Sequence, residues 1–153
     1  FSVCSSTPLA TSITTITLAA KWTNFDPKRD ASKSILIIDC IGVLSTAYAH
    51  GDIAYIGGGM GTKGLHNTLE AAVFGLALII GKNYRRYPEA KQLIENGGMT
   101  SVRSPEEFAQ IYHQLILEKE LRNKQGNANQ NFIKTHQGAT EKIISFLKTQ
   151  FET

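Results

Sequence analysis

The sequence predicts an α/β protein in which a doubly wound parallel sheet carries helices on both faces and a helical tail follows at the C-terminus. Two observations support this prediction. Short apolar segments alternate four times with segments of helical periodicity, and the loops between them are short. Residues 35–38 form a continuous β-branched and leucine run, which is typical of a parallel strand buried on both faces.

The elements follow one another regularly from residue 34. Ser104, Pro105 and the two glutamates that follow make a strong helix start, with a cap, a first-turn proline and acids against the dipole. Apolar runs predict strands at 35–38, 53–56, 76–80 and 99–102. Helical spacing and end signals predict helices at 42–50, 68–75, 88–96, from 105 onward, at 123–135 and at 141–151.

Residues 1–30 differ from the rest of the chain. Serine and threonine are abundant up to Thr17, and the polar stretch 21–31 contains Pro27 and is predicted to be a linker. We therefore divide the chain into an atypical, poorly packed segment at 1–30 and one α/β domain at 31–153. The first residue is not Met and no signal-peptide start follows it, so we expect a piece of a longer protein.

Composition excludes several classes of function. A chain of 153 residues with 42% hydrophobic residues suits one soluble domain. A net charge of +3 is too small to predict binding to nucleic acid. Cys4 and Cys40 fit no metal-binding spacing, so we expect free thiols in a reducing compartment and no metal site. The apolar runs are all shorter than a membrane-spanning helix requires.

The most informative stretch is a glycine-rich loop at 57–64, between the strand at 53–56 and the helix at 68–75. It contains five glycines, which allow positive φ and close approach of a ligand to the backbone. Asn67 stands at the expected N-cap, and Glu70 completes a capping box three residues later. A strand, a glycine loop and a helix start together predict an anion site.

Parallel strands bring their carboxyl ends to one edge of the sheet, so the loops at 39–43, 57–67 and 81–86 are expected to converge on one crevice. Lys82, Arg85 and Arg86 in the last loop have two interpretations, a solvated loop or a contact with phosphate or lipid. The aromatic side chains of Tyr48, Phe74, Tyr112 and Phe151 are predicted to be core residues.

Dinucleotide binding is one interpretation of the loop, because Gly59, Gly61 and Gly64 formally match the Rossmann fingerprint. That fingerprint expects an acidic residue at the end of the next strand, where this sequence has Gly81-Lys82 with Arg85 close by. Only an NADP-type site survives, and it is the least favoured alternative. The P-loop spacing also fails, because Lys63 follows a threonine and not a glycine.

A longer match is more specific. It comprises Ile38-Asp39-Cys40-Ile41-Gly42, residues 51–59, Gly64-Leu65-His66-Asn67-Thr68-Leu69-Glu70-Ala71-Ala72, Gly81-Lys82-Asn83-Tyr84 and Glu89-Ala90. In these motifs, from about residue 35 to 102, the chain resembles the C-terminal half of 3-deoxy-D-manno-octulosonic acid (Kdo) transferases. These are GT-B glycosyltransferases that attach Kdo to lipid A precursors in lipopolysaccharide biosynthesis. The resemblance implies that 31–153 is the Rossmann-like, nucleotide-sugar-binding half of a GT-B fold.

The resemblance also implies a role for each loop in binding the donor, CMP-Kdo. Backbone groups near Gly42 would contact the nucleotide, N–H groups at 67–69 would bind the phosphate, and Glu70 would accept hydrogen bonds from ribose hydroxyls. No cofactor or metal is expected. The implied donor-binding residues are Ile41, Gly42, Val43, Gly58, Gly59, Gly64, His66, Asn67, Thr68, Leu69 and Glu70, with Gly81 and Asn83 as further candidates.

The family's catalytic base is a carboxylate of the N-terminal domain, so the resemblance implies no catalytic residue in this chain and no activity by the chain alone. The lipid A precursor and the membrane surface would meet that missing half. The full-length protein would work in the cytoplasm, at the inner face of the bacterial inner membrane.

The sequence departs from the family in several places. Ala77 and Lys82 stand where the family has proline, and a Pro-Arg or Pro-His-Glu motif is not found upstream of Asp39. Two alternatives therefore stay open. One is a GT-B domain that uses a UDP-sugar, and the other is a non-catalytic nucleotide-binding module.

Overall fold

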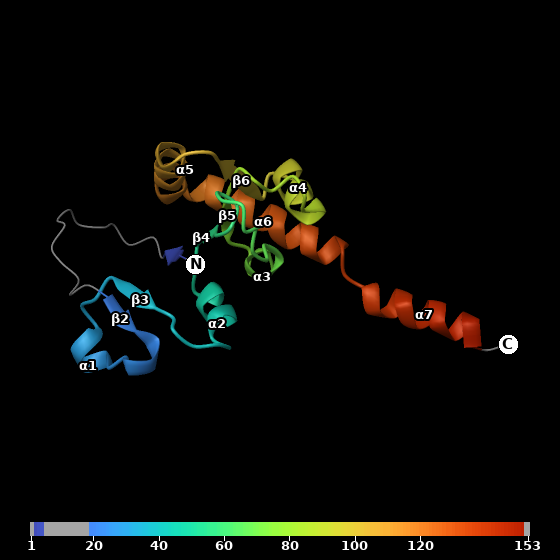
Figure 1. The fold of residues 1–153 in the computed structure, drawn as a ribbon, viewed down its shortest axis with the longest axis horizontal. Coiled ribbons are helices and arrows are strands. Elements are labelled where there is room, and N and C mark those ends of the chain that lie inside the picture. Colours follow the sequence, from blue (N-terminus) through green and yellow to red (C-terminus); the bar gives the residue numbers. More distant parts are fainter. Residues whose placement is uncertain (1, 5–18, 152–153) are drawn as a thin grey trace.

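Within the described part of the chain, the main sheet has four strands. The structure, a computed structural model, describes residues 2–4 and 19–151, and places β1 (Ser2–Cys4), β4 (Ile53–Ile56), β5 (Ala77–Gly81) and β6 (Met99–Val102) in the order β1-β4-β5-β6 (Figure 1). Strands β4, β5 and β6 are parallel, and β1 runs antiparallel to β4. Three of the four predicted strands therefore lie in the main sheet, with β5 shifted by one residue from its predicted bounds.

Two apolar cores lie on opposite faces of this sheet, because successive side chains of a strand point to opposite sides. Leu78 and Ile80 of β5 belong to one core, and Ala77 and Ile79 to the other. Helices α2 (Leu44–Ala49), α3 (Leu69–Ala72), α4 (Pro88–Glu95) and α6 (Lys119–Thr135) contribute to the first core, and α5 (Pro105–Leu117) to the second. The predicted α/β class with helices on both faces is confirmed.

The strand predicted at 35–38 lies elsewhere. It forms β3 (Ile35–Ile37), which pairs in parallel with β2 (Ala19–Lys21) in a separate two-stranded sheet. Its three side chains are between 44% and 55% exposed. The strand prediction was right, but burial on both faces and membership of the main sheet were wrong. An apolar run favours an extended segment but does not determine which strand it pairs with. The two-stranded sheet also lacks packed layers that could bury both of its faces.

The segment predicted as a linker at 21–31 contains two short helices, η2 (Trp22–Asn24) and α1 (Pro27–Asp30), which corrects that prediction. Asp30 is buried, with Arg29 Nη2 at 2.7 Å and Lys33 Nζ at 3.1 Å from its carboxylate oxygens. Hydrogen bonds from Arg29 and from the Asp26 backbone hold the pKa of Asp30 well below its usual range. Strands β2 and β3 lie on either side of residue 30 in the sequence and pair with each other. The domain boundary predicted at residue 30 stays a prediction.

Helix α5 begins as predicted, since Ser104 Oγ accepts a hydrogen bond from the backbone N–H of Glu107 at 3.2 Å. Helix α6 begins at Lys119, four residues before its predicted start at Asn123. The extra turn brings Arg122 to the end of α5, where its Nη1 donates to the backbone oxygen of Leu115 at 2.6 Å.

The C-terminal helix α7 (Ala139–Phe151) is confirmed as a helix but buries none of its residues. Phe151 is 81% exposed and Phe74 is 37% exposed, so their assignment to the core was wrong, whereas Tyr48 is buried as predicted. Helix α7 extends away from the sheet (Figure 1), and its large apolar residues are between 45% and 81% exposed. Throughout the described part of the chain, no helix has the length and apolarity needed to cross a membrane.

Candidate functional site: a braced glycine loop

The glycine loop folds back on itself after β4. Gly58 has φ +86° and Gly64 φ +96°, and a Cβ added to Gly58 would overlap the carbonyl oxygen of Gly64. The backbone N–H of His66 donates to the oxygen of Gly57 at 3.1 Å and closes the loop at its base. Side chains are therefore excluded from Gly58 by conformation and by contact.

The loop that follows β5 braces the glycine loop. The backbone N–H of Asn83 donates to Gly59 O at 2.8 Å, and Asn83 Nδ2 donates to Gly61 O at 3.0 Å. The hydroxyl of Tyr87 accepts from the Leu65 N–H at 3.0 Å. The predicted convergence of these two loops is confirmed. Sequence reasoning missed Tyr87, for which the only signal was an aromatic residue in a polar loop.

The third loop, at 39–43, does not join them. The Asp39 carboxylate accepts from the backbone N–H and the hydroxyl of Thr23, at 3.1 and 2.9 Å, and these bonds lower the pKa of Asp39. Ile41 is fully exposed, and within the described residues no hydrogen bond links 39–43 to the glycine loop. This part of the predicted convergence was wrong, because β3 belongs to the smaller sheet and carries Asp39 with it.

Asn67 and Glu70 are joined, but not as a capping box. Asn67 Oδ1 accepts from the Leu69 N–H at 3.0 Å, and Asn67 Nδ2 donates to Glu70 Oε1 at 3.1 Å. The N-cap is Thr68, one residue later than predicted, and its side chain caps nothing. Helix α3 has four residues, so its dipole is weaker than the predicted longer helix would supply. The outcome is an exposed carboxylate held beside the loop by Asn67.

Beneath this exposed surface the packing is apolar. Tyr48 of α2 is buried, and burial, followed by the charge of Glu70, raises the pKa of Tyr48 to about 12. Thr68 is also buried, and neither its hydroxyl nor that of Tyr48 has a hydrogen-bond partner among the described residues. The polar side chains of Thr62, Lys63, His66, Asn67 and Glu70 are exposed at this surface.

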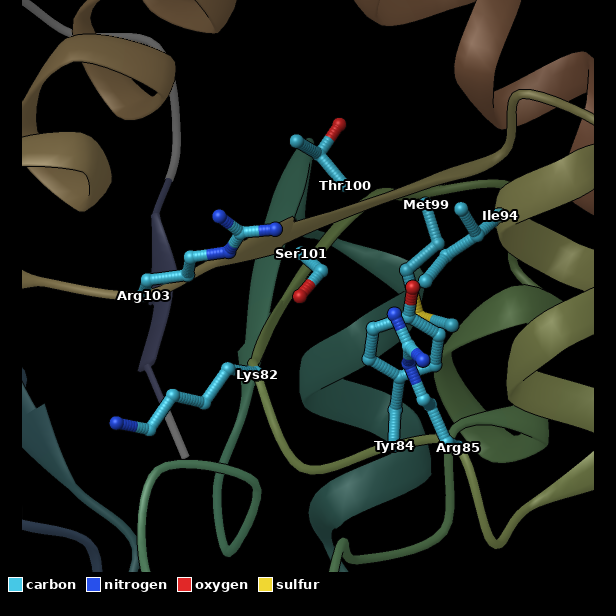
Figure 2. A pocket seen from close by; sticks show the side chains of 8 residues that line it. All are labelled: Lys82, Tyr84, Arg85, Ile94, Met99, Thr100, Ser101 and Arg103. Atoms are coloured by element: carbon cyan, nitrogen blue, oxygen red, sulfur yellow. The ribbon is translucent and has the colours of Figure 1, made fainter.

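No cluster of metal-binding side chains forms among residues 2–4 and 19–151, where Cys40 is an exposed free thiol. A pocket of about 400 Å³ adjoins the loop that follows β5, residues 82–87, which we call the brace loop (Figure 2). Its lining includes Lys82 and Arg85 from that loop but none of the residues predicted to bind a nucleotide. The pocket is thus a neighbour of the glycine loop and not part of it.

The fold has a solved counterpart. The C-terminal CMP-Kdo binding domain of WaaA from Acinetobacter baumannii matches with a TM-score of 0.67 and 18% sequence identity, over 76% of this chain and 61% of that chain. The chain therefore has the Rossmann-like fold of the C-terminal half of a GT-B protein.

Sequence comparison gives the more particular likeness. The chain is 31% identical over 120 residues to the 3-deoxy-D-manno-octulosonic acid transferase of Haemophilus influenzae, covering 77% of this chain and 28% of that protein. It is 29% identical over 101 residues to a bifunctional glycosyltransferase/methyltransferase of Fusobacterium nucleatum, covering 65% and 16%. No family model matches the chain. The predicted resemblance to Kdo transferases is confirmed. The chain spans less than a third of the length of either relative.

Proposed function

We propose that residues 31–153 are the donor-binding half of a glycosyltransferase, that the donor is CMP-Kdo, and that the full-length enzyme transfers Kdo to a lipid A precursor. The observation that carries the proposal is the closed and braced glycine loop between β4 and α3, in a chain that resembles Kdo transferases. The fold of the CMP-Kdo binding domain of WaaA from Acinetobacter baumannii supports the same choice of donor.

The donor phosphate would lie at the end of the glycine loop, where the backbone N–H groups of Asn67 and Thr68 donate to no acceptor within the described residues. Gly58, Gly59 and Gly64 would let the donor approach the main chain. Glu70, oriented by Asn67, would accept hydrogen bonds from the ribose hydroxyls. His66, Leu69, Gly81 and Asn83 complete the proposed site at the loop.

Ile41, Gly42 and Val43 would contact the nucleotide through their backbone. Val43 immediately precedes α2, and Tyr48 of α2 packs in the same core as Ala71 and Ala72 of α3. The two helices are thus joined beneath the site, and α2 would carry residues 41–43 toward a bound nucleotide. This arrangement predicts that nucleotide binding orders 41–43 against the loop.

In this proposal, the chain contributes positioning and charge stabilisation to the reaction, because the CMP group already activates the bond that breaks. We propose that the catalytic base and the acceptor site belong to the N-terminal domain of the full-length enzyme, which would act at the inner face of the bacterial inner membrane. The relatives contain the length of chain that such a domain requires.

Calorimetric titration of the chain with CMP and with UMP tests the proposal. We expect CMP to bind about tenfold or more tightly than UMP, a difference of about 1.4 kcal/mol. Tighter binding of UMP would favour a UDP-sugar donor, an alternative that the similarity to a glycosyltransferase of unstated donor keeps open. If neither nucleotide binds, the donor-binding role is wrong for this chain.

A further inference from the structure

The charged side chains that line the pocket beside the brace loop are all basic in the described part of the chain. It lies between the loop after β5, the strand β6 and helix α4 (Figure 2). Lys82, Arg85 and Arg103 contribute cationic side chains, and Ser101 contributes a hydroxyl. Figure 2 shows Lys82 and Arg103 on one side of Ser101 and Arg85 on the other. Among the described residues, no aspartate or glutamate lines the pocket.

The three cations have no counter-ion in the described part of the chain. Other basic side chains do pair, as Arg29 and Lys33 do with Asp30, whereas Lys82, Arg85 and Arg103 take part in no ion pair there. The carboxylate of Glu107 bonds to Arg103, but it accepts from the backbone N–H of Arg103, at 2.6 Å, and not from the guanidinium. The guanidinium donors of Arg103 stay available.

The neighbouring groups leave Ser101 facing the pocket. Strand β6 is an edge strand that pairs only with β5 among the described strands, so the backbone groups on its outer edge have no partner strand. The hydroxyl of Ser101 donates to Gly81 O at 3.3 Å and keeps its lone pairs free to accept. Thr100 is engaged separately, by Gln125 Nε2 at 3.1 Å.

Different side chains of the brace loop contact the glycine loop and the pocket. Asn83 and Tyr87 hydrogen-bond to the glycine loop, whereas Lys82, Tyr84 and Arg85 line the pocket. A ligand in the pocket would therefore touch different side chains from a nucleotide at the glycine loop. Tyr84 and Ile94 give the pocket an apolar wall, which suits a ligand with a carbon body as well as charge.

We propose that this pocket is a second anion site that binds the phosphoryl group of an organic phosphate. The phosphoryl oxygens accept hydrogen bonds from Lys82, Arg85 and Arg103, since charge-assisted bonds to phosphate are the strongest that these side chains form. The carbon body lies against Tyr84 and Ile94. Such a ligand exists free in solution or as the head group of a phospholipid, and the two sources present the same chemistry. The site does not depend on the proposed donor.

Amide NMR of the full chain at low salt tests the site with glycerol 3-phosphate as the probe. We expect saturable shifts at residues 82–85 and 101–103. Replacing all three cations with glutamine is expected to weaken binding about tenfold to a hundredfold. Arg86→Gln is the matched control, because Arg86 is exposed on the same loop and does not line the pocket. Within the described residues the side chains of these three cations take part in no ion pair, so an unchanged spectrum elsewhere is expected and verifies folding of the variant.

Shifts confined to residues 57–67, or equal weakening by Arg86→Gln, would overturn the second site. Co-sedimentation distinguishes the two sources, using phosphatidylcholine vesicles with and without phosphatidic acid. Pelleting of the wild type, but not of the triple variant, with the acidic vesicles assigns a lipid head group. Binding of glycerol 3-phosphate without pelleting assigns a soluble phosphate. If neither probe binds, the proposal is wrong whatever the result with CMP.

Discussion

The side-chain amide of Asn129 donates to the backbone oxygen of Leu76 at 2.7 Å, and also to that of Gly98 at 2.7 Å. Asn129 is fully buried on α6, and the two oxygens belong to the residues just before β5 and β6. One amide thus ties the starts of two neighbouring strands to the helix that covers them.

We expect Asn129→Ala to lower the free energy of unfolding by about 2–4 kcal/mol, because two buried carbonyl oxygens lose their donor. Urea denaturation measures the change. Asn131→Ala is the matched control, since Asn131 is exposed on the same helix, and a change within about 0.5 kcal/mol is expected there. Equal effects of the two substitutions would show that the two hydrogen bonds of the Asn129 amide contribute nothing to stability.

Gly58→Ala is expected to open the glycine loop. Alanine strains the backbone at φ +86° by about 1–2 kcal/mol, and its Cβ would collide with the Gly64 carbonyl oxygen. Gly61→Ala is the control, because a Cβ there meets no atom of the described residues within 4 Å. We expect lower melting temperature and CMP affinity for Gly58→Ala alone. A parallel loss in Gly61→Ala would point to loop flexibility and not to the contact at Gly58.

Glu70→Gln separates ribose binding from a role in local structure. The substitution keeps the shape but loses the charge-assisted bonds, so CMP affinity is expected to fall about tenfold to a hundredfold, which is about 1.5–3 kcal/mol. The bond from Asn67 Nδ2 can persist, so the melting temperature is expected to change little. Glu95→Gln, an exposed position on α4, is the control. Unchanged CMP affinity with a lowered melting temperature would leave Glu70 only a structural role.

Two tyrosines are expected to respond in opposite ways to loss of the hydroxyl. The Tyr48 hydroxyl is buried without a partner among the described residues, so Tyr48→Phe is expected to leave stability unchanged or raise it by about 1 kcal/mol. The Tyr87 hydroxyl accepts from the Leu65 N–H, so Tyr87→Phe is expected to lower stability by about 1 kcal/mol. Thermal and urea unfolding of both variants measure these changes, and destabilisation by Tyr48→Phe would indicate a hydrogen bond at its hydroxyl.

Asp30 is expected to make the small β2–β3 sheet sensitive to acid. Its pKa is lowered in the folded protein, so the ionised form stabilises the fold above the unfolded pKa of about 3.9 and this contribution is lost as the pH falls further. Hydrogen exchange of residues 19–37 is expected to accelerate below about pH 4 relative to β5. In Asp30→Asn that difference is expected to shrink, because no carboxylate remains to protonate. Identical pH profiles for the two proteins would contradict the assignment.

Sequence patterns that involve only a few neighbouring residues predicted the local structure correctly. The strands at β4, β5 and β6, the cap at Ser104 and the glycine loop each depend on residues close together in the chain. Strand periodicity, a capping hydroxyl and the need for positive φ act over a few residues, so the sequence displays them directly. The single-turn length of α3 and the early start of α6 show that helix ends are less well defined by such signals.

The sequence by itself determined the α/β class, the position of the glycine loop and the resemblance that names a donor. Only the tertiary structure decided that β3 pairs with β2, that Asn83 and Tyr87 brace the loop, and that Arg103 joins Lys82 and Arg85 at one pocket. It also decided that α7 leaves its apolar residues exposed. The physical reason is separation along the chain. These features depend on which distant segments meet, and periodicity, capping and turn preferences carry no information about that pairing.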